Sequence, residues 1–194
     1  ALTTATEFLS SDMLIEKAPI LIRMADRFAA GQIRNSATIG GNVCNASPAG
    51  DMIIPLLLLD ATVYMASWAD DALVTRTVPL SEFFTGPGKT VLRKGEMLSC
   101  VRFVPPSFDF TARVEKFGTR PALDISVASV GVAGRLDNGA LNDARVALAA
   151  VAPTPLPARR PEALPDVPVL TYAAIALHPA TLRAATPPLS ESLP

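Results

Sequence analysis

The amino-acid sequence predicts an α+β protein built from two successive units. Helical spacing of apolar residues dominates residues 4–31, whereas short β-rich runs dominate from Ala61 onward. Helices and strands that occupy separate parts of a chain are typical of α+β folds. Because two adjacent prolines terminate a strand, Pro105 and Pro106 mark a boundary. We therefore expect one unit at residues 1–106 and a second at residues 107–194.

Cap residues place the first helices. Thr4 and Glu7 have the spacing of a capping box, and Ser11 offers a second N-cap. Pro19 suits the first turn of a longer helix, which Gly31 is expected to end. The apolar face of that helix is formed by Ile20, Leu21, Met24 and Phe28. Residues 32–51 lack periodicity and predict a long irregular segment, of a kind that often carries function.

The remaining elements are a short apolar helix and a series of strands. The helix is expected at residues 52–59. The strands are expected at residues 61–67, 73–78, 98–104, 111–117, 124–136 and 141–151. Asp137, Asn138 and Gly139 predict a hairpin turn. Small side chains along 124–136 indicate close approach by a helix or by another chain.

The tail from about residue 153 is atypical because it is rich in proline. It contains ten of the 18 prolines and no glycine. Since proline lacks the backbone donor that helices and sheets use, we expect mostly irregular or extended chain there. One short helix is expected near residues 172–177.

Composition excludes several classes of function. The chain has 194 residues, of which 49% are hydrophobic and 18% charged, and its net charge is -1. This balance provides no field for attracting phosphate backbones, so we expect no nucleic-acid partner. The scattered His178, Cys44 and Cys100 lack the spacing of metal ligands, so no metal site is predicted. No acid–base constellation is visible, so no catalytic residue is predicted and any chemistry falls to a bound cofactor.

The sequence also indicates where the protein resides. Both cysteines lie far apart in apolar surroundings and are expected to be reduced thiols of a cytoplasmic protein. Residues 1–10 lack the pattern of a signal peptide. The most apolar run, residues 52–59, is much shorter than the ~20 residues that cross a bilayer, so no membrane span is predicted.

The segment at residues 32–42 is the most informative motif. Its adjacent glycines, Gly40 and Gly41, allow the backbone to approach a ligand and to present bare amides to a pyrophosphate or a flavin carbonyl. Thr38 and Asn42 add side-chain donors, and Asp51 could accept hydrogen bonds from sugar hydroxyls. On physical grounds alone, an ordinary turn explains the glycine pair equally well.

Two further motifs have simpler explanations. The segment at residues 86–90 resembles the end of a phosphate-binding P-loop, but Phe83 stands where that motif needs glycine. An exposed turn that carries Lys89 explains it better. Lys116 alternates with Glu115 and Phe117 in a predicted strand, and its spacing alone favours a solvated lysine.

Taken together and in order, these segments resemble the FAD-binding domain of molybdenum hydroxylases, the relatives of xanthine dehydrogenase and carbon monoxide dehydrogenase. The resemblance rests on residues 32–35, 38–42, 45–51, 83–90, 96–98, 115–118 and 151–155. It implies the second lobe of a PCMH-type FAD-binding domain at residues 1–106. A small antiparallel-sheet domain at residues 107–194 is then implied to follow it.

The resemblance also implies roles for individual residues. It assigns cofactor binding to Ala37, Thr38, Gly40, Gly41, Asn42, Asn45, Asp51, Leu98 and Lys116. The pyrophosphate and the flavin would be lined by Thr38, Gly40, Gly41 and Asn42. Asp51 would bind sugar or ribityl hydroxyls. Leu98 would pack near the rings. Lys116 would contact FAD, which reverses the preference for a solvated side chain.

The implied function is electron transfer by an FAD-binding subunit. In this family, a molybdenum-cofactor large subunit hydroxylates the substrate, and a 2Fe-2S small subunit passes electrons to the flavin, which reduces NAD or another acceptor. The family pattern expects a further lobe before Ala1, and the proline-rich tail departs from the family. The alternative is therefore a truncated assembly or interaction module without flavin.

Overall fold

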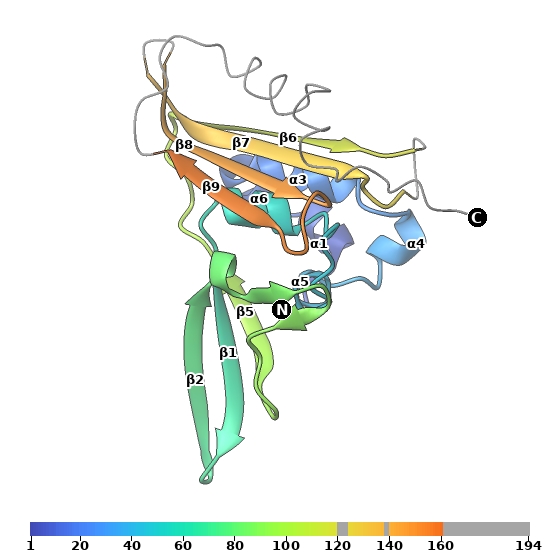
Figure 1. Cartoon of the computed structure of the whole chain (residues 1–194), viewed down its shortest axis with the longest axis vertical. Coiled ribbons are helices and arrows are strands. Elements are labelled where there is room, and N and C mark those ends of the chain that lie inside the picture. Colours follow the sequence, from blue (N-terminus) through green and yellow to red (C-terminus); the bar gives the residue numbers. More distant parts are fainter. Residues whose placement is uncertain (120–123, 138–139, 161–194) are drawn as a thin grey trace, which may run out of the picture.

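The computed structural model describes residues 1–119, 124–137 and 140–160. Helices form the first part of the chain and antiparallel sheets the rest, which confirms the predicted α+β class (Figure 1). The helices are α1 (Ala5–Leu9), α2 (Asp12–Lys17), α3 (Pro19–Asp26), α4 (Gly31–Arg34), α5 (Ile39–Cys44), α6 (Ile53–Leu58) and the 3-10 turn η1 (Leu80–Glu82).

The strands form three antiparallel sheets within the described residues. The strands are β1 (Thr62–Ala69), β2 (Ala72–Pro79), β3 (Phe84–Gly86), β4 (Lys89–Thr90), β5 (Met97–Arg102), β6 (Phe110–Phe117), β7 (Ala128–Asp137), β8 (Ala140–Ala149) and β9 (Leu156–Arg160). The strand orders are β2-β1-β5, β3-β4 and β6-β7-β8-β9.

The predicted helix caps are present, but α3 ends earlier than expected. Thr4 and Glu7 form the capping box, and Ser11 accepts a hydrogen bond from the Leu14 amide. Gly31 does not end α3; it begins α4 instead. The Arg34 side chain stabilises this end, because its Nη1 atom donates to the backbone oxygens of Asp26, Phe28 and Ala29.

The prediction of an irregular segment at residues 32–51 is only partly correct. Two short helices, α4 and α5, occupy much of it. The Thr38 side chain caps α5 by accepting a hydrogen bond from the Gly41 amide at 2.9 Å. This cap provides a local reason for a helix where sequence periodicity is absent, since six residues are too few to show a period.

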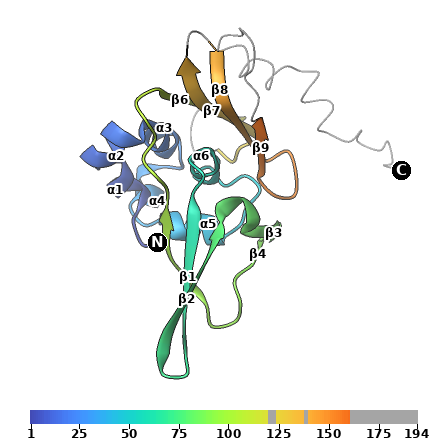
Figure 2. The ribbon, with the colours of Figure 1, turned by 90° about the vertical axis from the view of Figure 1, so that its left-hand side faces the viewer.

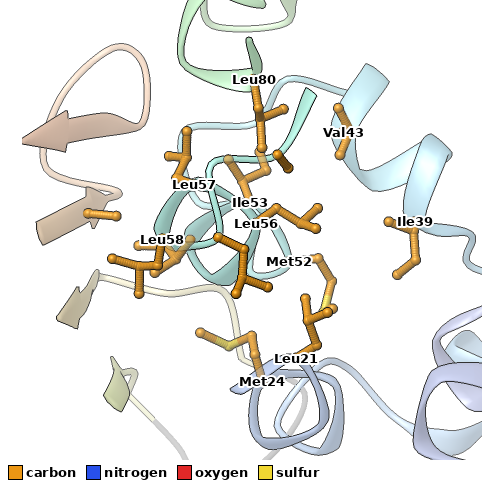
Figure 3. Close-up of a cluster of buried hydrophobic side chains, with 14 of the residues drawn as sticks. Leu21, Met24, Ile39, Val43, Met52, Ile53, Leu56, Leu57, Leu58 and Leu80 are labelled. Carbon is orange, nitrogen blue, oxygen red and sulfur yellow. The ribbon is translucent and has the colours of Figure 1, made fainter. Parts of the chain in front are cut away.

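The core is built around α6, which is buried on every side. Figure 3 shows its leucines and isoleucines meeting Leu21 and Met24 of α3, with α5 beside them. Gly131 of β7 faces this helix. A Cβ atom at Gly131 would lie 2.6 Å from Leu58 and 2.7 Å from Ile54. The strand therefore approaches α6 more closely than a larger residue permits, and a helix is the partner that this small residue accommodates.

The sheet β2-β1-β5 extends away from the rest of the molecule, as Figures 1 and 2 show from two sides. Its β1–β2 turn contains Asp70 and Asp71, both with positive φ, as a tight hairpin requires. The segment that resembled a P-loop forms the β3–β4 hairpin. Gly88 has a φ of 66° there, and Lys89 is exposed, so the prediction of a simple turn is confirmed.

The sheet β6-β7-β8-β9 packs one face on α3 and α6. Strand β9 lies at the start of the proline-rich tail, where irregular or extended chain was predicted. Pro157 is tolerated in it because β9 is the edge strand of this sheet within the described residues. The predicted helix near residues 172–177, His178 and the turn residues Asn138 and Gly139 lie outside the described residues.

Candidate functional site

A buried network of Asp51, Lys116 and Ser126 connects the two parts of the chain. We call it the Asp51 network. Asp51 precedes α6, Lys116 is on β6 and Ser126 precedes β7. Lys116 Nζ lies 2.6 Å from Asp51 Oδ2, and Ser126 Oγ donates to Asp51 Oδ1 at 2.8 Å. Residues separated by 65 and 75 positions in sequence are thereby joined.

The Asp51 network is almost sealed from solvent. The side chains of Lys116 and Asp51 are 6% and 8% exposed, respectively. Interpreting Lys116 as a solvated lysine is therefore wrong. Its Nζ atom also donates to the backbone oxygen of Asp124 at 2.8 Å. A buried ammonium requires such partners, because an unpaired charge in the interior is strongly destabilising.

Asp51 also faces a pocket of about 320 Å³ between the helical segment and the loop before β7. The lining residues are Phe28, Ala29, Ile33, Asn42, Asn45, Ser47, Ala49, Gly50, Asp51, Asp124 and Ile125. Apolar and aromatic walls with a few polar side chains are typical of cofactor sites. Three predicted site residues, Asn42, Asn45 and Asp51, meet here.

Asn42 has an unsatisfied atom at this pocket. Its Oδ1 atom is buried and has no hydrogen-bond partner among the described residues. Buried polar atoms normally have partners, so an orphaned acceptor in a pocket wall is compatible with a ligand donor. With the carboxylate of Asp51 and the amide of Asn45, the pocket has polar side chains that can accept and donate hydrogen bonds.

The glycine pair does not present bare amides, so that prediction was wrong. The Gly40 amide donates to the backbone oxygen of Ala1 at 2.9 Å, and the Gly41 amide is used by the Thr38 cap. Gly40 serves close packing instead, because a Cβ atom there would lie 2.7 Å from the Ala1 oxygen. Both amides are therefore engaged within the protein.

The other predicted residues are not part of the pocket lining. Ala37 accepts a hydrogen bond from the Ala5 amide through its backbone oxygen. Leu98 is on β5, which packs against α5, and it belongs to the hydrophobic core with 6% exposure. Neither Thr38 nor Lys116 lines the pocket. Thr38 supports α5, and Lys116 lies behind Asp51.

Sequence reasoning missed Ser126 and the apolar wall of the pocket. Ser126 was interpreted only as one small residue in a strand. Its hydrogen bond to Asp51 spans 75 positions, and no local pattern signals such a contact. Phe28 was assigned to the apolar face of a helix that in fact ends before it. Its place in the pocket wall follows from the turn after α3.

A second charged network lies at the other end of α6. Arg145 on β8 donates to the Leu58 oxygen at 2.9 Å, and it forms ion pairs with Asp60 at 2.8 Å and Asp143 at 2.9 Å. Its guanidinium also lies 5.7 Å from the centre of the Phe110 ring. We call Arg145, Asp60 and Asp143 the Arg145 network.

The cysteines and the remaining titratable side chains form no further centre within the described parts of the chain. Cys44 and Cys100 are both free thiols, as predicted. Burial raises the pKa of the Cys44 thiol, which disfavours a reactive thiolate. No three metal-binding side chains gather among the described residues. None of the described helices has the length and apolar character needed to cross a bilayer.

Comparisons with known proteins identify the family. A family model described as "FAD binding domain in molybdopterin dehydrogenase" matches residues 1–106. The chain is 36% identical over 155 residues to the xanthine dehydrogenase FAD-binding subunit of Escherichia coli O157:H7, covering 79% of this chain and 52% of that protein. It is 31% identical over 156 residues to the carbon monoxide dehydrogenase medium chain of Afipia carboxidovorans, covering 80% and 52%.

A solved structure gives the same result. The chain superposes on a chain of reconstituted CO dehydrogenase from Oligotropha carboxidovorans with a TM-score of 0.75 and 29% sequence identity. The match covers 81% of this chain and 53% of that chain. The chain thus spans about half the length of the relatives it matches.

Proposed function

The chain belongs to the family of FAD-binding domains of molybdopterin dehydrogenases, and we propose that it is the flavin-bearing electron-transfer part of a molybdenum hydroxylase. FAD is the cofactor of this family, and the relatives are flavoprotein components of oxidoreductases. For this chain, the proposed route carries electrons from iron–sulfur clusters to the flavin and then to NAD or another acceptor.

One observation supports the proposal most directly. One pocket is lined by Asn42 of α5, Asn45 at the C-terminal end of that helix, and Asp51 before α6. The orphaned Asn42 oxygen and the carboxylate of Asp51 are suited to N–H and hydroxyl donors. At about 320 Å³, the pocket would take one portion of a dinucleotide rather than the whole molecule.

A bound flavin would supply the redox chemistry, and the chain's own residues would bind and orient it. Asp51 would accept hydrogen bonds from sugar or ribityl hydroxyls, and the two asparagines would contact the cofactor beside it. Thr38 would act indirectly by holding α5. Ala37, Gly40, Gly41 and Leu98 would shape the backbone and core that support this helix.

The proposed partners follow from the same family relationship. The relatives are named as medium chains or FAD-binding subunits, which are components of larger assemblies. We propose a molybdenum-cofactor large subunit and a 2Fe-2S small subunit as partners of this chain. We also propose that residues 1–106 form the flavin-binding lobe and residues 107–194 the second domain.

Flavin titration tests the proposal. Purified chain is titrated with FAD, FMN and riboflavin, and binding is followed by flavin fluorescence and by the visible spectrum. We expect saturable binding that Asn45→Ala weakens, because its amide lines the pocket. Asn142→Ala is the matched control, because Asn142 lies on β8, away from the pocket.

The outcomes separate the proposed function from its alternative. Binding of all three ligands would place the flavin ring or ribityl chain in the pocket, whereas binding of FAD alone would indicate the adenine portion. A colourless, folded protein that binds no flavin would overturn the proposal. It would favour an assembly module without flavin.

A further inference from the structure

Asp51 is the member of its network that lines the pocket, and both of its carboxylate oxygens are already held. Ser126 Oγ donates to Oδ1 at 2.8 Å, and Lys116 Nζ donates to Oδ2 at 2.6 Å. A carboxylate offers about four lone-pair positions, so acceptor capacity remains for a ligand in the pocket. The two donors lie behind it, because neither is part of the pocket lining.

We propose that Ser126 is a positioning residue that orients the Asp51 carboxylate toward a hydroxyl-bearing ligand. The inference rests on the proposed function, because it takes the pocket to be the flavin site. Ser126 is 5% exposed and reaches the pocket only through Asp51. Its role is therefore distinct from ligand contact.

The geometry explains why the Lys116 donor alone does not fix the orientation of the Asp51 carboxylate. Lys116 holds only Oδ2, and a carboxylate held at one oxygen can rotate about its terminal torsion, which is broad for aspartate. The Ser126 hydroxyl fixes the second oxygen and so defines the plane of the carboxylate. A carboxylate whose plane is fixed in advance binds its ligand at a lower entropic cost.

Ser129 provides a matched control on the same segment of chain. It is 2% exposed, and its hydroxyl has no hydrogen-bond partner among the described residues. Ser129→Ala therefore removes a buried hydroxyl without removing a described hydrogen bond. Ser126→Ala removes a hydroxyl of equal size together with its bond to Asp51.

The experiment measures riboflavin and FAD affinity for the wild-type chain, Ser126→Ala, Ser126→Thr and Ser129→Ala. Loss of a hydrogen bond to a charged group leads us to expect roughly tenfold weaker binding by Ser126→Ala. Ser126→Thr keeps the hydroxyl and is expected to recover most of the affinity. Ser129→Ala is expected to bind like the wild type.

A spectroscopic measurement separates positioning from general destabilisation. The ¹³C resonance of the Asp51 carboxylate in flavin-free protein is expected to shift in Ser126→Ala and to stay in place in Ser129→Ala. Thermal unfolding confirms that each variant is folded. A wild-type chain that binds flavin no more tightly than Ser126→Ala overturns this inference alone. A wild-type chain that binds no flavin overturns the proposed function as well.

Discussion

Helix α6 is joined to the four-stranded sheet by a charged network at each end, and the two networks differ in burial. In the Asp51 network, the Lys116 and Asp51 side chains are 6% and 8% exposed. In the Arg145 network, the Arg145 and Asp60 side chains are 20% and 35% exposed. Both networks connect the helical part of the chain to the sheet. They differ in how deeply their side chains are buried and in which residues surround them.

Their remaining hydrogen-bonding capacity suggests different roles. The guanidinium of Arg145 is engaged by Leu58, Asp60 and Asp143, and its Nε atom is buried without a partner among the described residues. This arrangement ties the end of α6 to β8. Asp51, by contrast, keeps acceptor positions on its pocket side. We therefore propose that the Arg145 network supports the structure and that the Asp51 network, which borders the site pocket, takes part in ligand recognition.

The largest effect is expected when Lys116 is replaced by alanine. That variant leaves the Asp51 carboxylate buried without its counterion, and breaking a buried pair typically lowers the free energy of unfolding by about 3–5 kcal/mol. Urea unfolding measures the change, with Lys89→Ala at an exposed turn as the control. A loss as small as that of Lys89→Ala would mean that the Lys116–Asp51 pair contributes little to stability.

Replacing Arg145 with alanine is expected to have a smaller effect on folding. It removes hydrogen bonds from a charged donor to the end of α6, which corresponds to about 1–3 kcal/mol of unfolding free energy. Flavin affinity in the folded variant should be unchanged, because Arg145 does not line the site pocket. Arg23→Ala, on the exposed face of α3, is the control for loss of a guanidinium. Weakened flavin binding in Arg145→Ala would contradict the division of roles.

Thr38→Ala tests how much the pocket beside Asp51 depends on α5. Loss of this N-cap should lower the free energy of unfolding by about 1 kcal/mol. Flavin binding should also weaken, because α5 carries Asn42 into the pocket wall. Thr38→Ser retains the capping oxygen and should behave like the wild type in both measurements. If Thr38→Ala lowered stability with no effect on affinity, α5 would not be needed to shape the pocket.

Local features of this fold could be predicted from the sequence, whereas its long-range contacts could not. The capping box at Thr4 and the Pro19 start of α3 depend on residues a few positions apart, and both are present. The occupied Gly40 amide and the Asp51–Ser126 bond depend on partners 39 and 75 positions away. Only folding brings these partners together, so no local pattern contains them.

The candidate site illustrates the same division. The polar motif residues Asn42, Asn45 and Asp51 were found from the sequence, because their spacing in a glycine-containing segment resembles the family. Their grouping around one pocket depends on the turn after α3 and on Ile125 before β7. Strand periodicity predicts the face of the sheet on which the Lys116 side chain lies. It does not predict which other part of the chain covers that face.

An ion pair away from α6 tests whether the extended sheet is independent of the pocket. Arg76 on β2 holds both carboxylate oxygens of Glu96 at 2.6 Å, and the Arg93 amide donates to it at 2.7 Å. These contacts, the Arg76 hydrogen bonds foremost, lower the pKa of Glu96 from its ordinary value of 4.5 to about 2. The folded state therefore favours the ionised form of Glu96 more strongly than the unfolded state does.

The sign of the pH effect follows from linkage. A carboxylate with a lowered pKa contributes stability that is complete above pH 4.5 and is lost as the pH falls toward about 2. Glu96→Gln should remove this part of the pH dependence, as measured by urea midpoints between pH 5 and pH 2.5, while flavin affinity at neutral pH stays unchanged. Glu82→Gln, on the exposed 3-10 turn, should leave the pH profile intact. If Glu96→Gln also weakened flavin binding, the extended sheet would be coupled to the pocket. Flavin binding would then depend on more than the Asp51 network.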